Sequence, residues 1–140
     1  MIQLCNTLLT VSFLLIAILH FYWSLGGKWL KHKTIPTKEP GIPLFQAGFL
    51  PCIFVSFAFI AFIIIVHADY FSMAIHTQRL LLGLILIAFL LRIIGDFSYV
   101  GLSKRVKHSV FAYMDNHYYI PICIFISLLL MFKLLTLPLA

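Results

Sequence analysis

The chain has 140 residues, of which 63% are hydrophobic and only 10% charged, whereas soluble domains are about 45–50% apolar and about 25% charged. A soluble core of this length cannot hide so much apolar surface, so most of the chain is expected to lie in lipid. The net charge of +6 does not indicate nucleic-acid binding, because the basic residues cluster in two short loops rather than along one long face.

Four stretches are long and apolar enough to cross a membrane, at about residues 4–25, 44–66, 78–99 and 118–138. They lack the alternation of barrel strands, and an open sheet cannot satisfy its backbone in lipid, so helices are predicted. The first stretch has no positive residues before it and no small-residue cleavage site after it, which favours a retained span. The chain is therefore predicted to be all-α: one polytopic, four-transmembrane-helix bundle over residues 1–140.

Lysine and arginine in the short loops predict the orientation, since cytoplasmic loops carry an excess of these residues. The second loop, 67–77, carries none. Loops 26–43 and 100–117 are therefore expected to be cytoplasmic, with both termini outside (N-out/C-out), and Lys133 is expected to reach the outer interface by snorkelling. The loop residues behind this prediction are Lys28, Lys31, Lys33, Lys38, Lys104, Arg105 and Lys107.

With this topology, polar side chains from all four helices meet at one depth, near the cytoplasmic ends. Arg92 and Asp96 are four residues apart, so they are predicted to share a helix face and to pair. Ionisable residues within a span usually face the bundle interior or a cavity. The alternative is that these residues only anchor the helices at the interface. The candidate ligand-binding residues are His20, Trp23, Gln46, Arg92, Asp96, Tyr99 and His117.

No metal or cofactor is expected from the sequence. The three cysteines lie far apart and form no Cys-x-x-Cys pair. His67, Asp69 and His76 in the second loop are ligand types for a transition metal, but their spacing matches no specific site.

Three segments of the chain resemble one known family. They are LLRIIGDFSYVGLSKRVK at 90–107, FAYMD and YYIPIC just after it, and HFYWSLGG at 20–27. The pattern is similar to a bacterial membrane family catalogued as domain of unknown function 3995. The resemblance implies a four-helix bacterial membrane protein without an assigned activity, located in the inner membrane.

The family's recurring positions fall on residues that the depth argument selects and on several glycines. Two departures stand out: Ser98 occupies a position where a basic residue is common, and Ile120 one where a small polar residue is usual. The departure at Ser98 puts in doubt any role that needs a second cation beside Asp96. The recurring positions are His20, Trp23, Gly26, Gly27, Arg92, Gly95, Asp96, Tyr99, Gly101, Asp115 and Pro121.

The sequence favours a protein that binds or transports an anionic or amphipathic ligand, or protons, at this polar layer, with Arg92 pairing the anion and His20 titrating near neutrality. Membrane lipids are the expected partners, and a homodimer or a larger membrane partner is compatible with four spans. One alternative is an enzyme acting on a lipid or isoprenoid, although no defined catalytic motif occurs. The others are an accessory subunit and a small haem protein ligated by His20 and His117.

Overall fold

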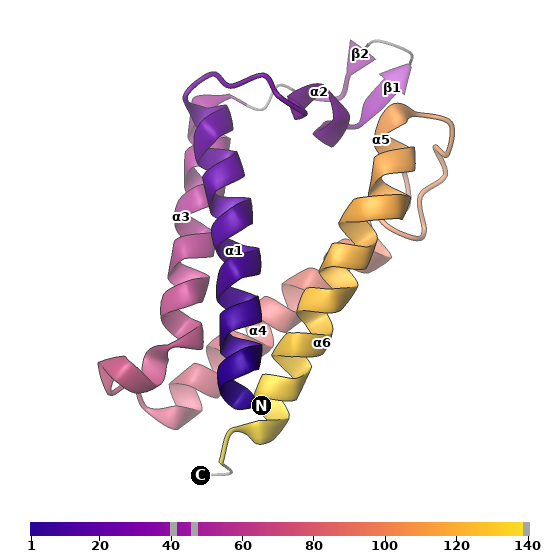
Figure 1. Ribbon diagram of the computed structural model, residues 1–140. Helices are drawn as coiled ribbons and strands as arrows, with labels where there is room; N and C mark the ends of the chain where they lie inside the picture. The colour runs from indigo at the N-terminus through magenta and orange to yellow at the C-terminus, as the bar shows by residue number, and fades with distance from the viewer. Residues whose placement is uncertain (40–41, 46–47, 139–140) are drawn as a thin grey trace.

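The computed structural model describes residues 1–39, 42–45 and 48–138. Its long helices are α1 (Ile2–Ser24), α3 (Phe49–Val66), α4 (Ile75–Ile94) and the continuous rod Val110–Thr136 (Figure 1). That rod consists of α5 (Val110–Met114), a π-helical turn η2 (Asp115–Tyr119) and α6 (Ile120–Thr136). The short elements are α2 (Lys31–Thr34), a two-stranded antiparallel pair β1 (Thr37–Glu39) and β2 (Ile42–Pro43), and the 3-10 helix η1 (Ala68–Phe71).

All four long helices are apolar and long enough to span a membrane, so the predicted all-α membrane fold is confirmed. Only 17% to 28% of each span is buried inside the protein. The remaining side chains are largely apolar and face outward, as expected for a protein whose solvent is lipid.

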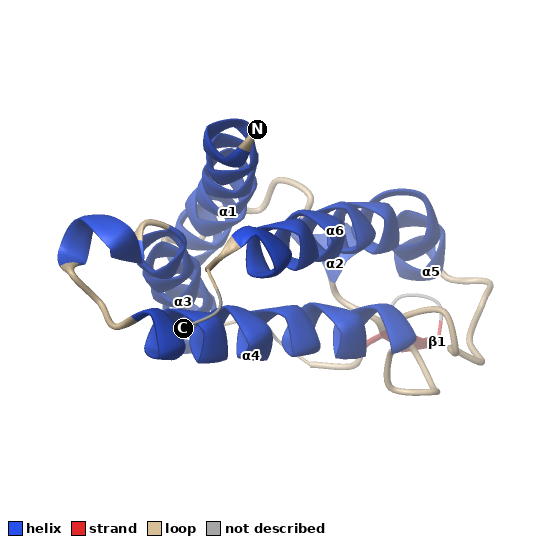
Figure 2. Ribbon diagram, turned by 90° about the horizontal axis from the view of Figure 1, so that it is seen from below, coloured by secondary structure: helices blue, strands red, loops and turns tan. Residues whose placement is uncertain are grey.

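The helices form two antiparallel pairs, α1 with α3 and α4 with α6. Figure 2 shows α4 and α6 lying side by side, while α1 also packs on α6. Along α1 the buried residues recur every four positions, at Cys5, Leu9, Phe13 and Ala17, and so form one stripe. Close packing of α1 against α3 lets the Ser56 hydroxyl donate to the Ala17 carbonyl at 2.9 Å.

A layer of phenylalanine rings fills the middle of the bundle and joins the two pairs. Phe13 is fully buried. Its ring centroid lies 5.7 Å from those of Phe59 and Phe62 on α3, and 6.0 Å from that of Phe89 on α4. This layer separates the polar groups at the two ends of the bundle.

The helix boundaries differ from the sequence prediction in ways that matter for the site. The third helix ends at Ile94 rather than near Tyr99, because Gly95 adopts a positive φ of 92° and turns the chain. The fourth rod begins at Val110, eight residues earlier than predicted, where the Ser109 hydroxyl caps it by accepting from the Ala112 N–H at 3.0 Å.

Lys133 does not snorkel outward, and that expectation is wrong. Its side chain is only 2% exposed, and its Nζ donates to Asn6 Oδ1 at 2.8 Å. The Asn6 amide on α1 provides a polar partner for the amine inside the bundle.

Candidate functional site

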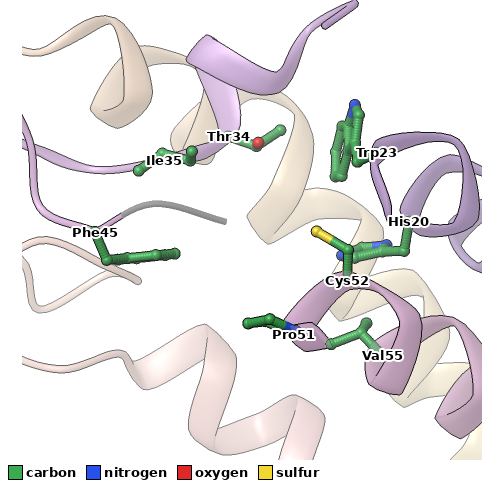
Figure 3. A pocket seen from close by; sticks show the side chains of 8 residues that line it. All are labelled: His20, Trp23, Thr34, Ile35, Phe45, Pro51, Cys52 and Val55. Carbon is green, nitrogen blue, oxygen red and sulfur yellow. The ribbon is translucent and has the colours of Figure 1, made fainter. Parts of the chain in front are cut away.

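A cavity of about 230 Å³ lies at the end of the bundle opposite the chain termini (Figures 1 and 3). The α1 helix contributes His20 and Trp23 to its wall, and the segment after α2 closes another side. Its surface is mainly apolar. The lining residues are His20, Trp23, Thr34, Ile35, Phe45, Pro51, Cys52 and Val55.

His20 is the polar side chain of this cavity that is best placed to meet a ligand. Its Nδ1 lies 2.8 Å from the Ile16 carbonyl oxygen, which can only accept, so Nδ1 carries the proton. Among the described residues, His20 makes no side-chain hydrogen bond other than this one, so Nε2 has no partner there. The ring is held between Trp23, at a centroid distance of 5.0 Å, and Phe59 at 6.3 Å. His20 therefore presents one unused nitrogen in a fixed orientation.

Trp23 fastens the loop beside the cavity. Its indole N–H donates to the Trp29 carbonyl at 2.8 Å, and its side chain is 5% exposed. The ring thus forms an apolar wall, because its only donor is already used. Cys52 of α3 also lines the cavity (Figure 3).

A second group of polar residues, the Asp115 cluster, consists of Arg92, Gly101, Lys104, Asp115 and Asn116. The fully buried Asp115 carboxylate accepts from Arg92 Nη2 at 2.7 Å, from Lys104 Nζ at 2.8 Å and from the Gly101 N–H at 2.9 Å. Lys104 Nζ also donates to the Gly101 carbonyl and to the Asn116 side chain. All three ammonium protons of Lys104 are therefore engaged, and two cations share one carboxylate.

Arg92 is the incompletely satisfied member of this cluster. Its Nη1 is buried and has no hydrogen-bond partner among the described residues, while the side chain as a whole is 32% exposed. A guanidinium offers a planar fork of donors that suits carboxylate and phosphate groups. Among the described residues of the cluster, Arg92 is therefore the cation that still offers a free hydrogen-bond donor.

The predicted pair of Arg92 with Asp96 does not form, because α4 ends before Asp96. Instead, Asp96 Oδ1 accepts from the backbone N–H groups of Ser98, Tyr99 and Val100 at 2.7 to 2.9 Å. The slight burial of Asp96 acts to raise its pKa, but these backbone donors outweigh it and hold the pKa below the ordinary value. Asp96 therefore stabilises a turn and is exposed rather than part of the Asp115 cluster.

Two glycines make this turn sterically feasible. Gly95 and Gly101 both have positive φ, at 92° and 80°. A Cβ on Gly95 would lie 1.7 Å from the Val100 carbonyl oxygen, and one on Gly101 would lie 2.5 Å from Gly95 Cα. The close approach of the two glycines brings the Gly101 N–H to Asp115. The segment Gly95–Gly101 therefore has an architectural role.

The other candidate residues that the structure describes lie apart from the cavity lining. His117 is exposed on η2, where Nδ1 lies 2.9 Å from the Tyr113 carbonyl and the two rings stack at 4.2 Å. Tyr99 is half-buried, and its backbone N–H donates to the Asp96 carboxylate. Gln46 lies outside the described residues. Of the predicted set, His20 and Trp23 come together at the cavity, and Arg92 joins the Asp115 cluster.

Sequence reasoning missed Lys104 and the apolar half of the cavity. Lys104 stands among other basic loop residues, and its charge was interpreted only as a topology signal. Asp115 was one of the family's recurring positions, which was the available hint of a carboxylate partner. Among the described residues, no three His, Cys, Asp or Glu side chains lie together in a way that could hold a metal ion.

One contact links the two groups of residues. The Tyr119 hydroxyl donates to the Lys33 carbonyl at 3.4 Å, and Thr34 and Ile35, which follow Lys33, line the cavity. Tyr119 stands one helical turn after Asp115. The cavity wall and the Asp115 cluster are therefore bridged through one aromatic side chain.

Comparisons with known proteins agree with the motifs. No curated protein and no solved structure matches the chain. A family model described as "Protein of unknown function (DUF3995)" matches residues 13–130, which include the cavity residues of α1, the Gly95–Gly101 turn and Asp115. The chain therefore belongs to the DUF3995 family.

Proposed function

We propose that this membrane protein binds an anionic amphiphile, such as a lipid or fatty-acid-like molecule with an acidic headgroup. The apolar part would occupy the cavity beside Trp23 and Val55, and His20 Nε2 would hydrogen-bond a polar atom of the ligand. Arg92 would meet the negative charge. The anion would have to reach Arg92 past Tyr119, which stands between the cavity wall and the Asp115 cluster.

The charge imbalance of the Asp115 cluster carries this proposal. Two cations share one carboxylate, Lys104 is saturated with acceptors, and one buried nitrogen of Arg92 has no partner among the described residues. An unmet donor in a region shielded from water is costly, so an acidic group arriving there gains a charge-assisted hydrogen bond.

We also propose that this end of the bundle faces the cytoplasm of a bacterial cell, with loops 26–43 and 100–117 in contact with the inner surface of the inner membrane. The lysines and arginines of both loops support this orientation. They would also attract anionic lipid headgroups and so raise the local concentration of the proposed ligand.

Cys52 provides a readout of cavity occupancy. The test uses a Cys5→Ala/Cys123→Ala background in nanodiscs of neutral lipid, and measures the rate at which N-ethylmaleimide alkylates Cys52. Dodecyl phosphate should slow this reaction, and uncharged dodecanol should do so only at about tenfold higher concentration. Such a preference corresponds to about 1.4 kcal/mol, which is typical of a hydrogen bond to a charged group.

Arg92→Lys is the decisive variant, since a lysine can still pair with Asp115 but lacks the second nitrogen. It should abolish the preference for dodecyl phosphate while leaving dodecanol protection unchanged. Arg105→Lys, an exposed residue of the same loop region, is the matched control and should behave like the wild type. Equal protection by the two probes in the wild type would refute anion recognition.

A further inference from the structure

A second polar site surrounds Lys133 at the end of the bundle where both termini lie (Figure 1). Lys133 is on α6, and its hydrogen bond to Asn6 on α1 joins the two helix pairs. Beside it, the Cys5 thiol donates to the Leu129 carbonyl at 3.3 Å, again from α1 to α6. The α1–α6 contact at this end is therefore held by side-chain hydrogen bonds as well as by apolar packing.

The ammonium of Lys133 has no counter-charge in contact with it. Among the described residues the ion pairs involve only Asp115, so no carboxylate lies within ion-pair distance of Lys133. The ionisable groups that act on it from the neighbouring elements are Cys5 of α1 and Asp69 of η1.

Two further titratable or charged groups at this end have partners of their own. Arg79 of α4 donates to the carbonyls of Leu137 and Pro138, and His67 Nε2 lies 2.8 Å from the Thr10 hydroxyl. None of these three hydrogen bonds involves the Lys133 amine.

Lys104 provides an internal comparison, because both lysines are almost fully buried. Lys104 uses its three protons on three acceptors, one of them a carboxylate. Lys133 uses one proton on a neutral amide. A buried lysine that lacks a counter-charge changes its protonation state readily, whereas one held by a carboxylate stays charged.

The phenylalanine layer around Phe13 lies between Lys133 and the cavity at the other end. Lys133 is therefore nearer to the end with the termini, and proton exchange is expected from that side. The neighbouring Asn6 lies in the second turn of α1, and the half-buried Thr10 and His67 provide polar groups at the same end.

We propose that Lys133 is a proton-binding site, open to the aqueous phase on the side of the termini, and that its protonation state controls the α1–α6 contact. The ammonium draws Asn6 toward α6, and loss of the proton weakens this hydrogen bond because a neutral amine is a poorer donor. The helix pairs would then separate more easily at this end. This inference does not depend on the proposed ligand.

Nuclear magnetic resonance of the full chain in nanodiscs, with ε-13C-labelled lysine, tests the first part. The Lys133 signal is assigned by its loss in the variant Lys133→Met. If that variant does not fold, Lys133→Arg, which keeps a cation at this position, serves instead. We expect the titration midpoint of Lys133 to differ from that of free lysine measured in the same buffer. Asn6→Asp should move the Lys133 midpoint alone.

Spin labels at two exposed positions, Thr7 on α1 and Leu135 on α6, test the second part. The distribution of distances between them should change at the Lys133 midpoint in the otherwise unmodified chain. It should be independent of pH when Lys133 is replaced. A Lys133 signal that titrates with the midpoint of free lysine, or a distance distribution that ignores its midpoint, would overturn the proposal.

Discussion

Replacing Asp115 with asparagine should destabilise the protein far more than the same substitution at the exposed Asp96. The substitution preserves shape and can still accept from Gly101, but it removes the counter-charge from Arg92 and Lys104. Lys104 is then left as a buried cation, with a side chain only 2% exposed. Removing one partner of a buried ion pair costs about 3–5 kcal/mol. For a chain of this length, such a loss lowers Tm by on the order of 10 °C.

Thermal unfolding in nanodiscs, followed by tryptophan fluorescence, measures this effect. Asp96→Asn is the matched control: it is the same substitution at an exposed residue, whose amide oxygen can still accept backbone N–H groups, so a much smaller loss than that of Asp115→Asn is expected. Combining Asp115→Asn with Lys104→Met should recover part of the loss, because it removes the buried charge that lost its partner. If Asp115→Asn unfolds within about 2 °C of the wild type, the ion pairs of Asp115 do not stabilise the fold.

Three further predictions concern the same end of the bundle. Gly101→Ala should cost about 2 kcal/mol or more in a denaturant titration, because alanine must adopt a φ of 80° and its Cβ would lie 2.5 Å from a facing backbone atom. The lowered pKa of Asp96 means that its carboxylate stabilises the turn above the unfolded-state pKa; this contribution is lost as pH falls through the folded-state pKa. Hydrogen exchange of the three amides bound to it, corrected for intrinsic rates, should therefore accelerate in acid, and Asp96→Asn should remove that pH dependence. Trp23→Phe deletes the N–H group that donates to the Trp29 carbonyl, and the loss of this hydrogen bond costs about 1 kcal/mol. The alkylation of Cys52 should therefore become about fivefold faster. An unchanged rate would show that this loop does not restrict access to the cavity.

The sequence was sufficient to predict the membrane fold, because span length and apolar content depend on the bilayer and not on tertiary contacts. It also identified the end of the bundle at which His20, Trp23 and Arg92 lie. It misplaced the end of the third helix. The predicted pairing of Arg92 with Asp96 required the helix to continue through Gly95, but α4 ends at Ile94. The positive φ of Gly95 depends on its close approach to the turn at Gly101, which no local pattern records.

Composition by itself predicted four helices that are long and apolar enough to cross a membrane, since lipid rejects unpaired polar groups wherever they occur along the chain. Only the tertiary structure decided which charges find partners. Arg92 pairs with Asp115, 23 residues away, and Lys133 pairs with Asn6 across 127 residues. Such pairs form because folding removes both groups from water at the same point in space, and separation along the chain does not reveal that point.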